Sequence, residues 1–233
     1  MRWVTLLGRI GTVILMIGLA LLVFSLIPSG TGSQSGWIPP IEPEQYIIRE
    51  LGVYSPQTGL QISVESTDNV HVYLLGVKSI ELDNWRTLLM EAYPDSDPYL
   101  EMFIYSYTVP MIFFHEAYPE ETHPNLDDPQ TQSMLWDVAV LDKGLQTYPE
   151  IILWDPPPSS AFSHELFPAD ALDIIAVFAN PSSNTVVVDM EIRDLAAVAA
   201  KERVILAARL LIPIGIALAI PWLILRKVKK STF

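Results

Sequence analysis

Residue types that could hold a metal ion gather between residues 115 and 130, in a stretch that prolines interrupt. Its histidines and carboxylates give one set of candidate ligands: His115, Glu116, His123, Asp127 and Asp128. Oxygen-rich loops suit calcium, whereas loops that mix histidine with carboxylates suit zinc or manganese. The stretch lacks the regular spacing and the central glycine of a calcium loop, so a solvated acidic loop is the alternative.

No other catalytic chemistry has a motif in the chain. The sequence contains no cysteine, which excludes disulfides, thiolate catalysis, and zinc or iron–sulfur sites with cysteine ligands. It also lacks G-x-S-x-G, a phosphate-binding P-loop, G-x-G-x-x-G and H-E-x-x-H. We therefore predict that the protein is not an enzyme and has no cofactor. A metal-dependent hydrolase would require His115 and His123 to converge in one pocket.

Aromatic residues point to binding rather than catalysis. Tyr99, Phe103, Tyr105 and Tyr107 share one parity of an expected strand, and a buried core explains them most simply. If that face is exposed instead, it is a surface that binds another protein.

The first of two apolar segments covers residues 10–27, eighteen consecutive residues without a charge. This length predicts a helix that crosses a membrane. Arg2 and Arg9 precede the segment, so a cleaved signal peptide is the alternative. The apolar part of a signal peptide usually has only about 7–15 residues, which favours an uncleaved anchor.

The second apolar segment covers residues 204–225 and carries one charge, Arg209. Its length also predicts a membrane helix, with bends at Pro213 and Pro221. Basic residues flank both segments on the sides of the chain ends: Arg2, Arg9, Arg226, Lys227, Lys229 and Lys230. The positive-inside rule then places both termini in the cytoplasm and the middle of a two-pass protein outside it.

Small residues inside the two segments predict how they pack. Gly11, Gly18 and Ala20 lie in the first segment, and Gly215, Ala217 and Ala219 lie in the second. Because small residues let membrane helices approach closely, we expect the two spans to pack against each other or against a partner's helix. Ordinary membrane composition is the alternative, since glycine is frequent in such helices.

The charge of the chain is concentrated between the two apolar segments. The whole sequence has a net charge of −13, but residues 29–200 hold 26 of the 27 acidic residues and only five bases, a net of −21. A domain of this charge repels nucleic acid and anionic lipid surfaces. Basic partners or a divalent cation would be attracted to it.

These features divide the chain into five parts. We expect an N-terminal anchor at 1–27, a linker at 28–43, an extracytoplasmic domain at 44–193, a helix that continues into the second anchor at 194–225, and a basic cytoplasmic tail at 226–233. The linker is rich in glycine and serine and then in proline. The Ala-rich stretch after residue 194 has no glycine or proline before the second apolar segment, which predicts one continuous helix.

Short runs with alternating or continuous apolar residues predict that the domain is mainly β. The expected strands are residues 46–53, 60–65, 70–77, 99–114, 135–141, 150–154, 172–179 and 185–192. Turn-forming residues at 67–69 and at 180–183 predict two hairpins. A short helix is expected at 83–92, capped by Asp83. The fold class that follows is an antiparallel β-sandwich flanked by two transmembrane helices.

The runs VHVYLLG and DIIAVFANPSSNTVVVDMEIRD, followed by a helix, a membrane span and a basic tail, resemble GOLD (emp24-like) domains. A short segment with Trp85 lies nearby, and the resemblance covers about half of the chain. It implies an extracytoplasmic β-sandwich of jelly-roll type that acts as a cargo adaptor or accessory binding module on a membrane anchor. The chain lacks the cysteine pair of eukaryotic members and has an additional N-terminal anchor, which favours a prokaryotic protein.

The leading hypothesis is a non-catalytic protein of the cell membrane whose outer domain binds a membrane protein partner or a second copy of itself. It would serve as an accessory or assembly subunit of a membrane complex. A sensor or solute-binding module is the alternative. The short cytoplasmic flanks are too small for a signalling domain, which favours the accessory role.

Overall fold

The computed structural model describes residues 2–26, 34–93, 98–119 and 136–230. The chain divides into two compact units. The first, here called the helix pair, contains residues 1–32 and 195–233, and the second, the central domain, contains residues 33–194.

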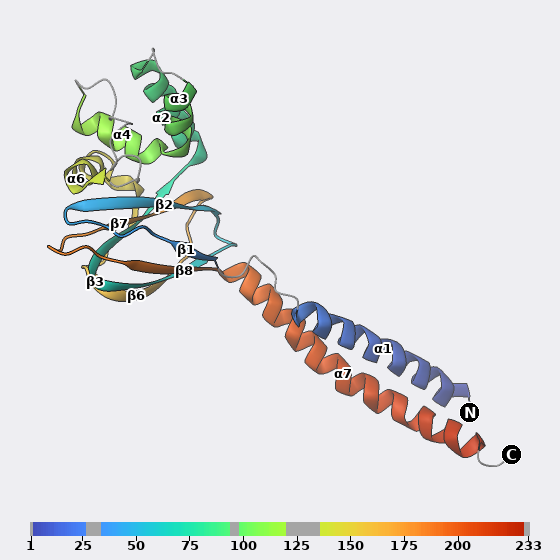
Figure 1. Ribbon diagram of the computed structural model, residues 1–233. Coiled ribbons are helices and arrows are strands. Elements are labelled where there is room, and N and C mark those ends of the chain that lie inside the picture. The colour runs from blue at the N-terminus through green and yellow to red at the C-terminus, as the bar shows by residue number, and fades with distance from the viewer. Residues whose placement is uncertain (1, 27–33, 94–97, 120–135, 231–233) are drawn as a thin grey trace. The chain divides into compact units, whose positions relative to one another are not determined.

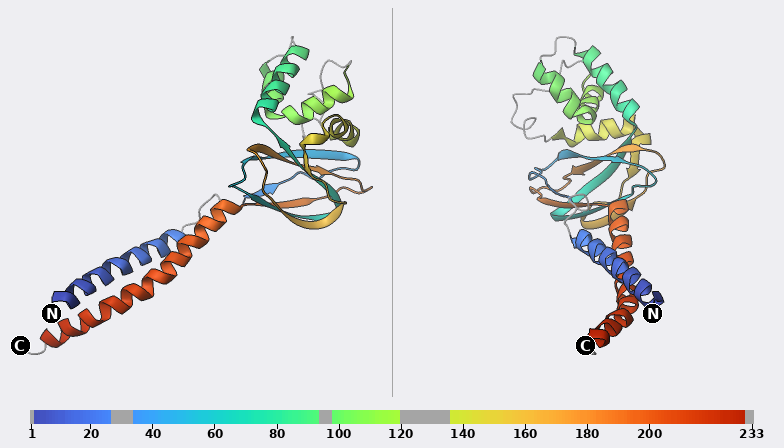
Figure 2. Two further views of the ribbon diagram at one scale, coloured as in Figure 1. Left: turned by 180° about the vertical axis from the view of Figure 1, so that it is seen from behind. Right: turned by 90° about the vertical axis from the view of Figure 1, so that its right-hand side faces the viewer.

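The helix pair consists of α1 (Arg2–Leu26) and α7 (Leu195–Lys230), which lie side by side (Figures 1 and 2). Both are long and apolar enough to cross a membrane, with a mean hydropathy of 2.3. Only 17% of the most apolar window of each helix is buried, so most of its apolar side chains are exposed rather than part of a protein core. These two helices fit a two-pass membrane protein. α7 continues without a break from the Ala-rich stretch through Pro213 and Pro221.

Glycines lie where the two helices are closest. Gly11, Gly18 and Gly215 are all buried. A Cβ added at Gly11 would come within 2.8 Å of the backbone nitrogen of Ala219, and one added at Gly215 within 2.6 Å of the backbone nitrogen of Leu15. Such distances leave no room for a side chain, so the glycines allow the two backbones to meet.

The central domain contains one mostly antiparallel sheet. Its strands are β1 (Gln34–Trp37), β2 (Gln45–Tyr54), β3 (Leu60–Val77), β4 (Trp136–Asp137), β5 (Ile152–Trp154), β6 (Ser159–Leu166), β7 (Leu172–Ala179) and β8 (Val188–Asp194). They pair in the order β1-β8-β3-β7-β2-β4, and β5 and β6 also pair with β3.

Strand β3 is a single strand of 18 residues, so the hairpin expected over 60–77 is wrong. Its first half pairs with β6 and β8, and its second half pairs with β5 and β7. The turn-forming residues at 67–69 lie where the register with β6 shifts, between Glu65 and Val70. A register irregularity of this kind bends a strand, and here it redirects β3 from one set of partners to the other.

The expected hairpin between residues 172 and 192 is also wrong. β7 pairs with β2 and β3, whereas β8 pairs with β1 and the other half of β3. The two strands are therefore consecutive in sequence without being paired to each other. Asn180 lies in the loop between them and is fully buried.

Helices form a separate layer on one face of β2, β7 and the second half of β3 (Figures 1 and 2). They are α2 (Ser79–Ala92), α3 (Pro98–Ser106), α4 (Thr108–Ala117) and α6 (Val138–Thr147), with a 3₁₀ turn at Pro149–Ile151. The strands expected at 99–114 and 135–141 are thus mostly helical. The N-cap of α2 is Lys78 rather than Asp83.

Two apolar clusters hold these layers. One lies between the helices and the sheet and includes Phe103, Phe113 and Trp136. The other includes Phe178 and Leu74 on one set of strands and Met190 on the other. Both halves of β3 contribute to the second cluster, which therefore packs the two sets of strands against one apolar core.

Candidate functional site

The outer face of α3 carries exposed apolar and aromatic side chains. Tyr99, Met102 and Tyr105 lie three residues apart and are 51%, 58% and 57% exposed. Leu100, Phe103 and Ile104, on the other side of the helix, are buried against α2, α4 and the sheet. We call the three exposed side chains the α3 face. Exposed aromatic and methionine side chains at helical spacing are typical of surfaces that bind other proteins.

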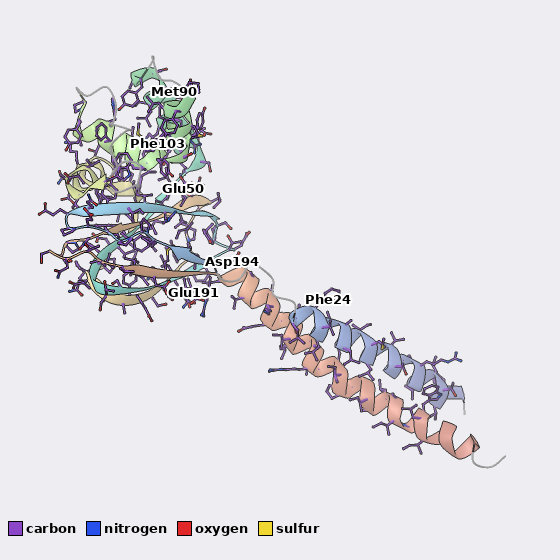
Figure 3. All side chains as sticks on the ribbon, in the orientation of Figure 1. Phe24, Glu50, Met90, Phe103, Glu191 and Asp194 are labelled. Atoms are coloured by element: carbon purple, nitrogen blue, oxygen red, sulfur yellow. The ribbon has the colours of Figure 1, made fainter. Side chains whose placement is uncertain are left out.

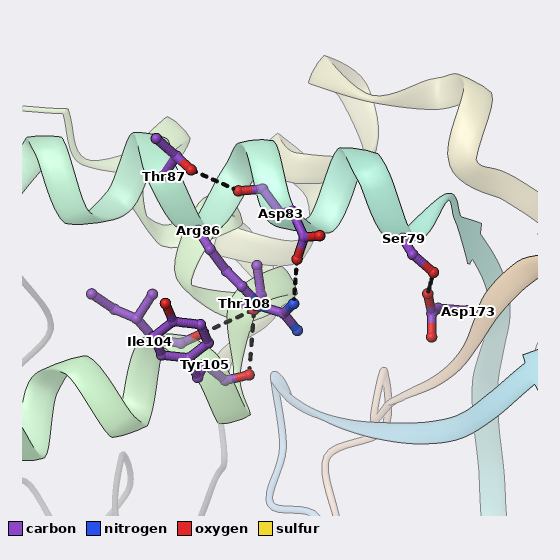
Figure 4. A network of polar contacts seen from close by, with 8 residues as sticks. All are labelled: Ser79, Asp83, Arg86, Thr87, Ile104, Tyr105, Thr108 and Asp173. Atoms are coloured by element: carbon purple, nitrogen blue, oxygen red, sulfur yellow. Dashed lines mark hydrogen bonds and ion pairs between the residues drawn. The ribbon is translucent and has the colours of Figure 1, made fainter.

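A polar network holds the α3 face against α2 (Figure 4). The guanidinium of Arg86 lies 5.6 Å from the ring centre of Tyr105, a cation–π distance. Its Nη1 donates to Asp83 at 2.9 Å and its Nε donates to the hydroxyl of Thr108 at 3.0 Å. The hydroxyl of Thr108 in turn donates to the carbonyl of Ile104 at 2.9 Å. Arg86 therefore joins three helices and fixes the position of Tyr105.

A small pocket lies beside this network, between β2 and the corner of α3 and α4. Its volume is about 200 Å³, and its wall includes Arg49, Glu50, Ser106 and Tyr107. Figure 3 labels Glu50, a residue of β2, and Phe103, a residue of α3. Sites for cofactors and drug-sized ligands usually measure about 300–1,000 Å³, so this pocket suits a single side chain or a small ion.

The charges in and near this pocket act on one another. Burial raises the pKa of Glu50, the nearby Arg86 lowers it in part, and Asp173 raises it. Burial also raises the pKa of the Tyr107 hydroxyl, while Arg49 lowers it. Arg49 and Arg86 are two of the five bases in the acidic residues 29–200. Both lie among carboxylates, since Arg86 pairs with Asp83 and Glu50 lines the same pocket as Arg49.

A second polar cluster joins His71, Tyr73 and Asp155. The Nε2 of His71 lies 2.7 Å from the Asp155 carboxylate, and the Tyr73 hydroxyl lies 2.9 Å from its Nδ1. Because a carboxylate only accepts, Nε2 carries the proton, and in the neutral ring Nδ1 accepts from Tyr73. Both ring nitrogens are then engaged. The cluster resembles a catalytic triad in its order, but it leaves His71 no nitrogen for a substrate or a metal.

Tyr73 is held as a neutral phenol. Burial raises its pKa to about 12, and Asp155 and Asp142 raise it as well. A phenol with a raised pKa is a poor nucleophile, which argues for a structural role of this cluster. The sequence did not predict this cluster, because Asp155 is 84 residues from His71. It shows only that His71 and Tyr73 are two residues apart on one expected strand.

The raised pKa of Tyr73 predicts how the domain responds to alkali. In the unfolded chain Tyr73 ionises near its ordinary pKa of 10, whereas in the folded domain it stays neutral until about pH 12. The contribution of Tyr73 to stability should therefore be constant below pH 10 and fall as the pH rises from 10 to 12. In Tyr73→Phe this fall should be smaller, as measured by urea unfolding at several alkaline pH values. An equally steep fall in Tyr73→Phe would contradict the assignment.

The predicted metal ligands do not form a described site. His115 and Glu116 lie on α4, where the Glu116 carboxylate accepts a hydrogen bond from the Tyr148 hydroxyl at 2.9 Å. The His115 ring meets the Tyr93 ring edge-on, with ring centres 6.0 Å apart. His123, Asp127 and Asp128 lie outside the described residues. Among the described residues no group of three or more histidine and acidic side chains could hold a metal ion.

No known protein family, curated protein or solved structure matches the chain. The resemblance to GOLD domains stays a prediction.

Proposed function

We propose that the protein is a membrane-anchored accessory subunit whose central domain binds a protein partner through the α3 face. α1 and α7 serve as the two anchors, with both termini in the cytoplasm and the central domain outside. In this proposal the two sets of strands that share β3 are the layers of a β-sandwich of GOLD type. The apolar cluster to which both sets contribute supports that arrangement.

The α3 face is the observation that carries this proposal. Its three side chains are large, apolar or aromatic, and more than half exposed. Interfaces are enriched in tyrosine and methionine, and a few such side chains supply most of the binding free energy. The Arg86 network fixes Tyr105 before binding, which lowers the entropy lost on association.

The acidic surface gives the partner its expected charge. Because residues 29–200 carry a net charge of −21, a partner with a basic surface is attracted and steered toward the domain. Screening by salt reduces this attraction, so the association rate should fall as the ionic strength rises.

A solute-binding module is the second candidate, and the pocket at Arg49 and Glu50 favours it. The pocket has a volume of about 200 Å³, and a guanidinium, a carboxylate and two hydroxyls line it. Such a site would fit a small charged solute. A bound solute should change the melting temperature of the full chain without any dependence on Met102.

The proposal is tested by replacing Met102 with glutamate in the full-length protein. Met102→Glu puts a charge on the centre of the α3 face and adds to the negative field of the domain. The partner recovered from membranes of the source cells after mild detergent extraction should fall about tenfold or more, as expected for the loss of a central contact. Recovery is measured by quantitative mass spectrometry against the unchanged protein.

Val187→Glu is the matched control. Val187 is also exposed, at 49%, and its replacement by glutamate adds the same charge to a different part of the central domain. The partner should remain bound to this variant. Equal recovery with both variants, or no specific partner with the unchanged protein, would contradict the proposal.

A further inference from the structure

A groove between α1 and α7 is lined by Arg9, Thr12 and Val13 on one helix and Trp222 on the other. Its volume is about 760 Å³, which is within the usual range for sites that bind drug-sized ligands. The side chain of Trp222 packs at Gly8, where an added Cβ would lie on top of the indole. Gly8 therefore makes room for Trp222 and helps to shape the groove.

The groove combines a fixed positive charge with apolar walls. Arg9 lies inside the apolar helix Trp3–Leu26, where a charged side chain is unfavourable unless it has a partner or a function. Next to it, Ile10 and Val13 are 44% and 58% exposed. The Thr12 hydroxyl donates its hydrogen to the carbonyl of Gly8 at 2.9 Å. A ligand in the groove would therefore accept hydrogen bonds from the Arg9 guanidinium and not from Thr12.

No acidic side chain of the helix pair can reach Arg9. The only acidic residue in segments 1–32 and 195–233 is Glu202. It is twenty residues from Trp222 along α7, which corresponds to about 30 Å of helix. An anion that neutralises Arg9 must therefore come from outside the helix pair.

The surroundings of the groove also favour an anion. α1 and α7 run in opposite directions, since Gly8 meets Trp222 while Gly18 meets Leu211 and Ile212. The start of α1 thus lies beside the end of α7, and this end of the pair contains most of its bases: Arg2, Arg9, Arg226, Lys227, Lys229 and Lys230. Clusters of bases next to a membrane helix attract anionic lipids.

We propose that this groove binds an anionic phospholipid, with its phosphate against the Arg9 guanidinium and an acyl chain along Val13. The inference rests on the proposed function, because it requires α1 and α7 to lie in a bilayer. In this arrangement the ring of Trp222 lies at the level of the lipid headgroups, where tryptophan is enriched in membrane proteins. The bound lipid supplies the negative charge that the helix pair lacks.

The test uses the full-length protein in phosphatidylcholine vesicles that contain traces of spin-labelled phosphatidylglycerol or spin-labelled phosphatidylcholine. Electron paramagnetic resonance measures the fraction of each lipid that the protein immobilises. The unchanged protein should prefer phosphatidylglycerol several-fold. Arg9→Gln should reduce this preference at least twofold, and Val13→Trp, which fills the groove without changing the charge, should reduce it as well.

Arg209→Gln is the control, because it also removes one charge from an apolar segment. Arg209 shares its own groove with Glu202, so a carboxylate is already present there. This variant should keep the preference for phosphatidylglycerol, and millimolar inorganic phosphate should not compete with the lipid. An unchanged preference in Arg9→Gln, an equal loss in Arg209→Gln, or displacement by phosphate would overturn the inference.

The two proposals fail in different ways. If the unchanged protein is removed from vesicles by an alkaline carbonate wash, it is not membrane-spanning and the proposed function fails. If the protein stays in the vesicles but immobilises both lipids equally, only the lipid inference fails.

Discussion

Gly215→Leu should separate α1 from α7 while the chain still enters the membrane. The added side chain would meet the backbone of Leu15, where even a Cβ comes within 2.7 Å of the Cα, and backbone cannot move aside as a flexible side chain can. Overpacking of this kind costs about 1–3 kcal/mol, which would lower the population of the packed pair roughly fivefold or more. Insertion should not suffer, because leucine is more apolar than glycine.

Disulfide formation measures this separation, and the absence of native cysteine makes the measurement clean. Gly18→Cys together with Leu211→Cys places two Cβ atoms about 3.1 Å apart, close to the range of a disulfide. Oxidation should link this pair efficiently in the otherwise unchanged protein and at least about fivefold less in the presence of Gly215→Leu.

Ala217→Leu is the control for this experiment. Ala217 is two residues away on the same helix but exposed, so its replacement adds the same kind of bulk on the face away from α1. Crosslinking should continue in this variant. If Gly215→Leu crosslinks as well as Ala217→Leu, the small residues are ordinary membrane composition and do not hold the pair together.

The helix pair was largely predictable, because its residues follow one simple rule. Long apolar runs form membrane helices, and the smallest residues mark the closest contact. Gly8 was not predicted as a contact residue, because the reason for a glycine there is the Trp222 side chain of the other helix, which leaves no room for a Cβ. The sequence also cannot show which small residues face outward, as the exposed Ala20 and Ala217 do.

The helical layer was mispredicted because its apolar residues fit two periods. Tyr99, Phe103, Tyr105 and Tyr107 share one parity, which favours a strand. The buried residues are instead Leu100, Phe103 and Ile104, which lie on one face of a helix. Aromatic side chains favour strands only weakly, and packing against α2 and α4 outweighs that preference. Pro98 in the first turn of α3 is a helix signal that the sequence does contain.

The β-strands were located well, but their partners were not. Residues 46–53 and 172–179 and most of 185–192 are strands as expected. Turn-forming residues were taken as hairpin loops, yet in β3 they occupy a bend within one strand, and between β7 and β8 they join strands that do not pair. Local sequence specifies that the chain turns, whereas long-range packing decides which strand it meets next.

The candidate site was predictable only in its chemical type. A buried core was the first interpretation of Tyr99 and Tyr105, and an exposed face that binds protein was the alternative. Only the helix shows that both are exposed and that Met102 lies on the same face. The pocket depends on Arg49 of β2 and Tyr107 near α4, which are 58 positions apart in the sequence. Such juxtapositions follow from tertiary structure and leave no local pattern.

The side chain of Asn180, in the loop between β7 and β8, stabilises the central domain. The Asn180 side chain is fully buried and makes four hydrogen bonds. Its Nδ2 donates to the carbonyls of Ile41 and Asn184 at 2.9 and 2.8 Å, and its Oδ1 accepts from the backbone nitrogen and the hydroxyl of Ser182. The side chain thus replaces the strand pairing that β7 and β8 do not make with each other.

Asn180→Ala should lower the melting temperature of the central domain by about 10 °C, because buried groups that lose their partners cost about 1–3 kcal/mol each. Near-ultraviolet circular dichroism of the full-length protein in detergent measures the transition. Asn184→Ala is the matched control, since Asn184 is exposed and contributes its backbone carbonyl, which the substitution keeps. Equal melting temperatures for the two variants would show that the loop is held by its backbone contacts, such as those between Ile41 and Val186, and not by Asn180.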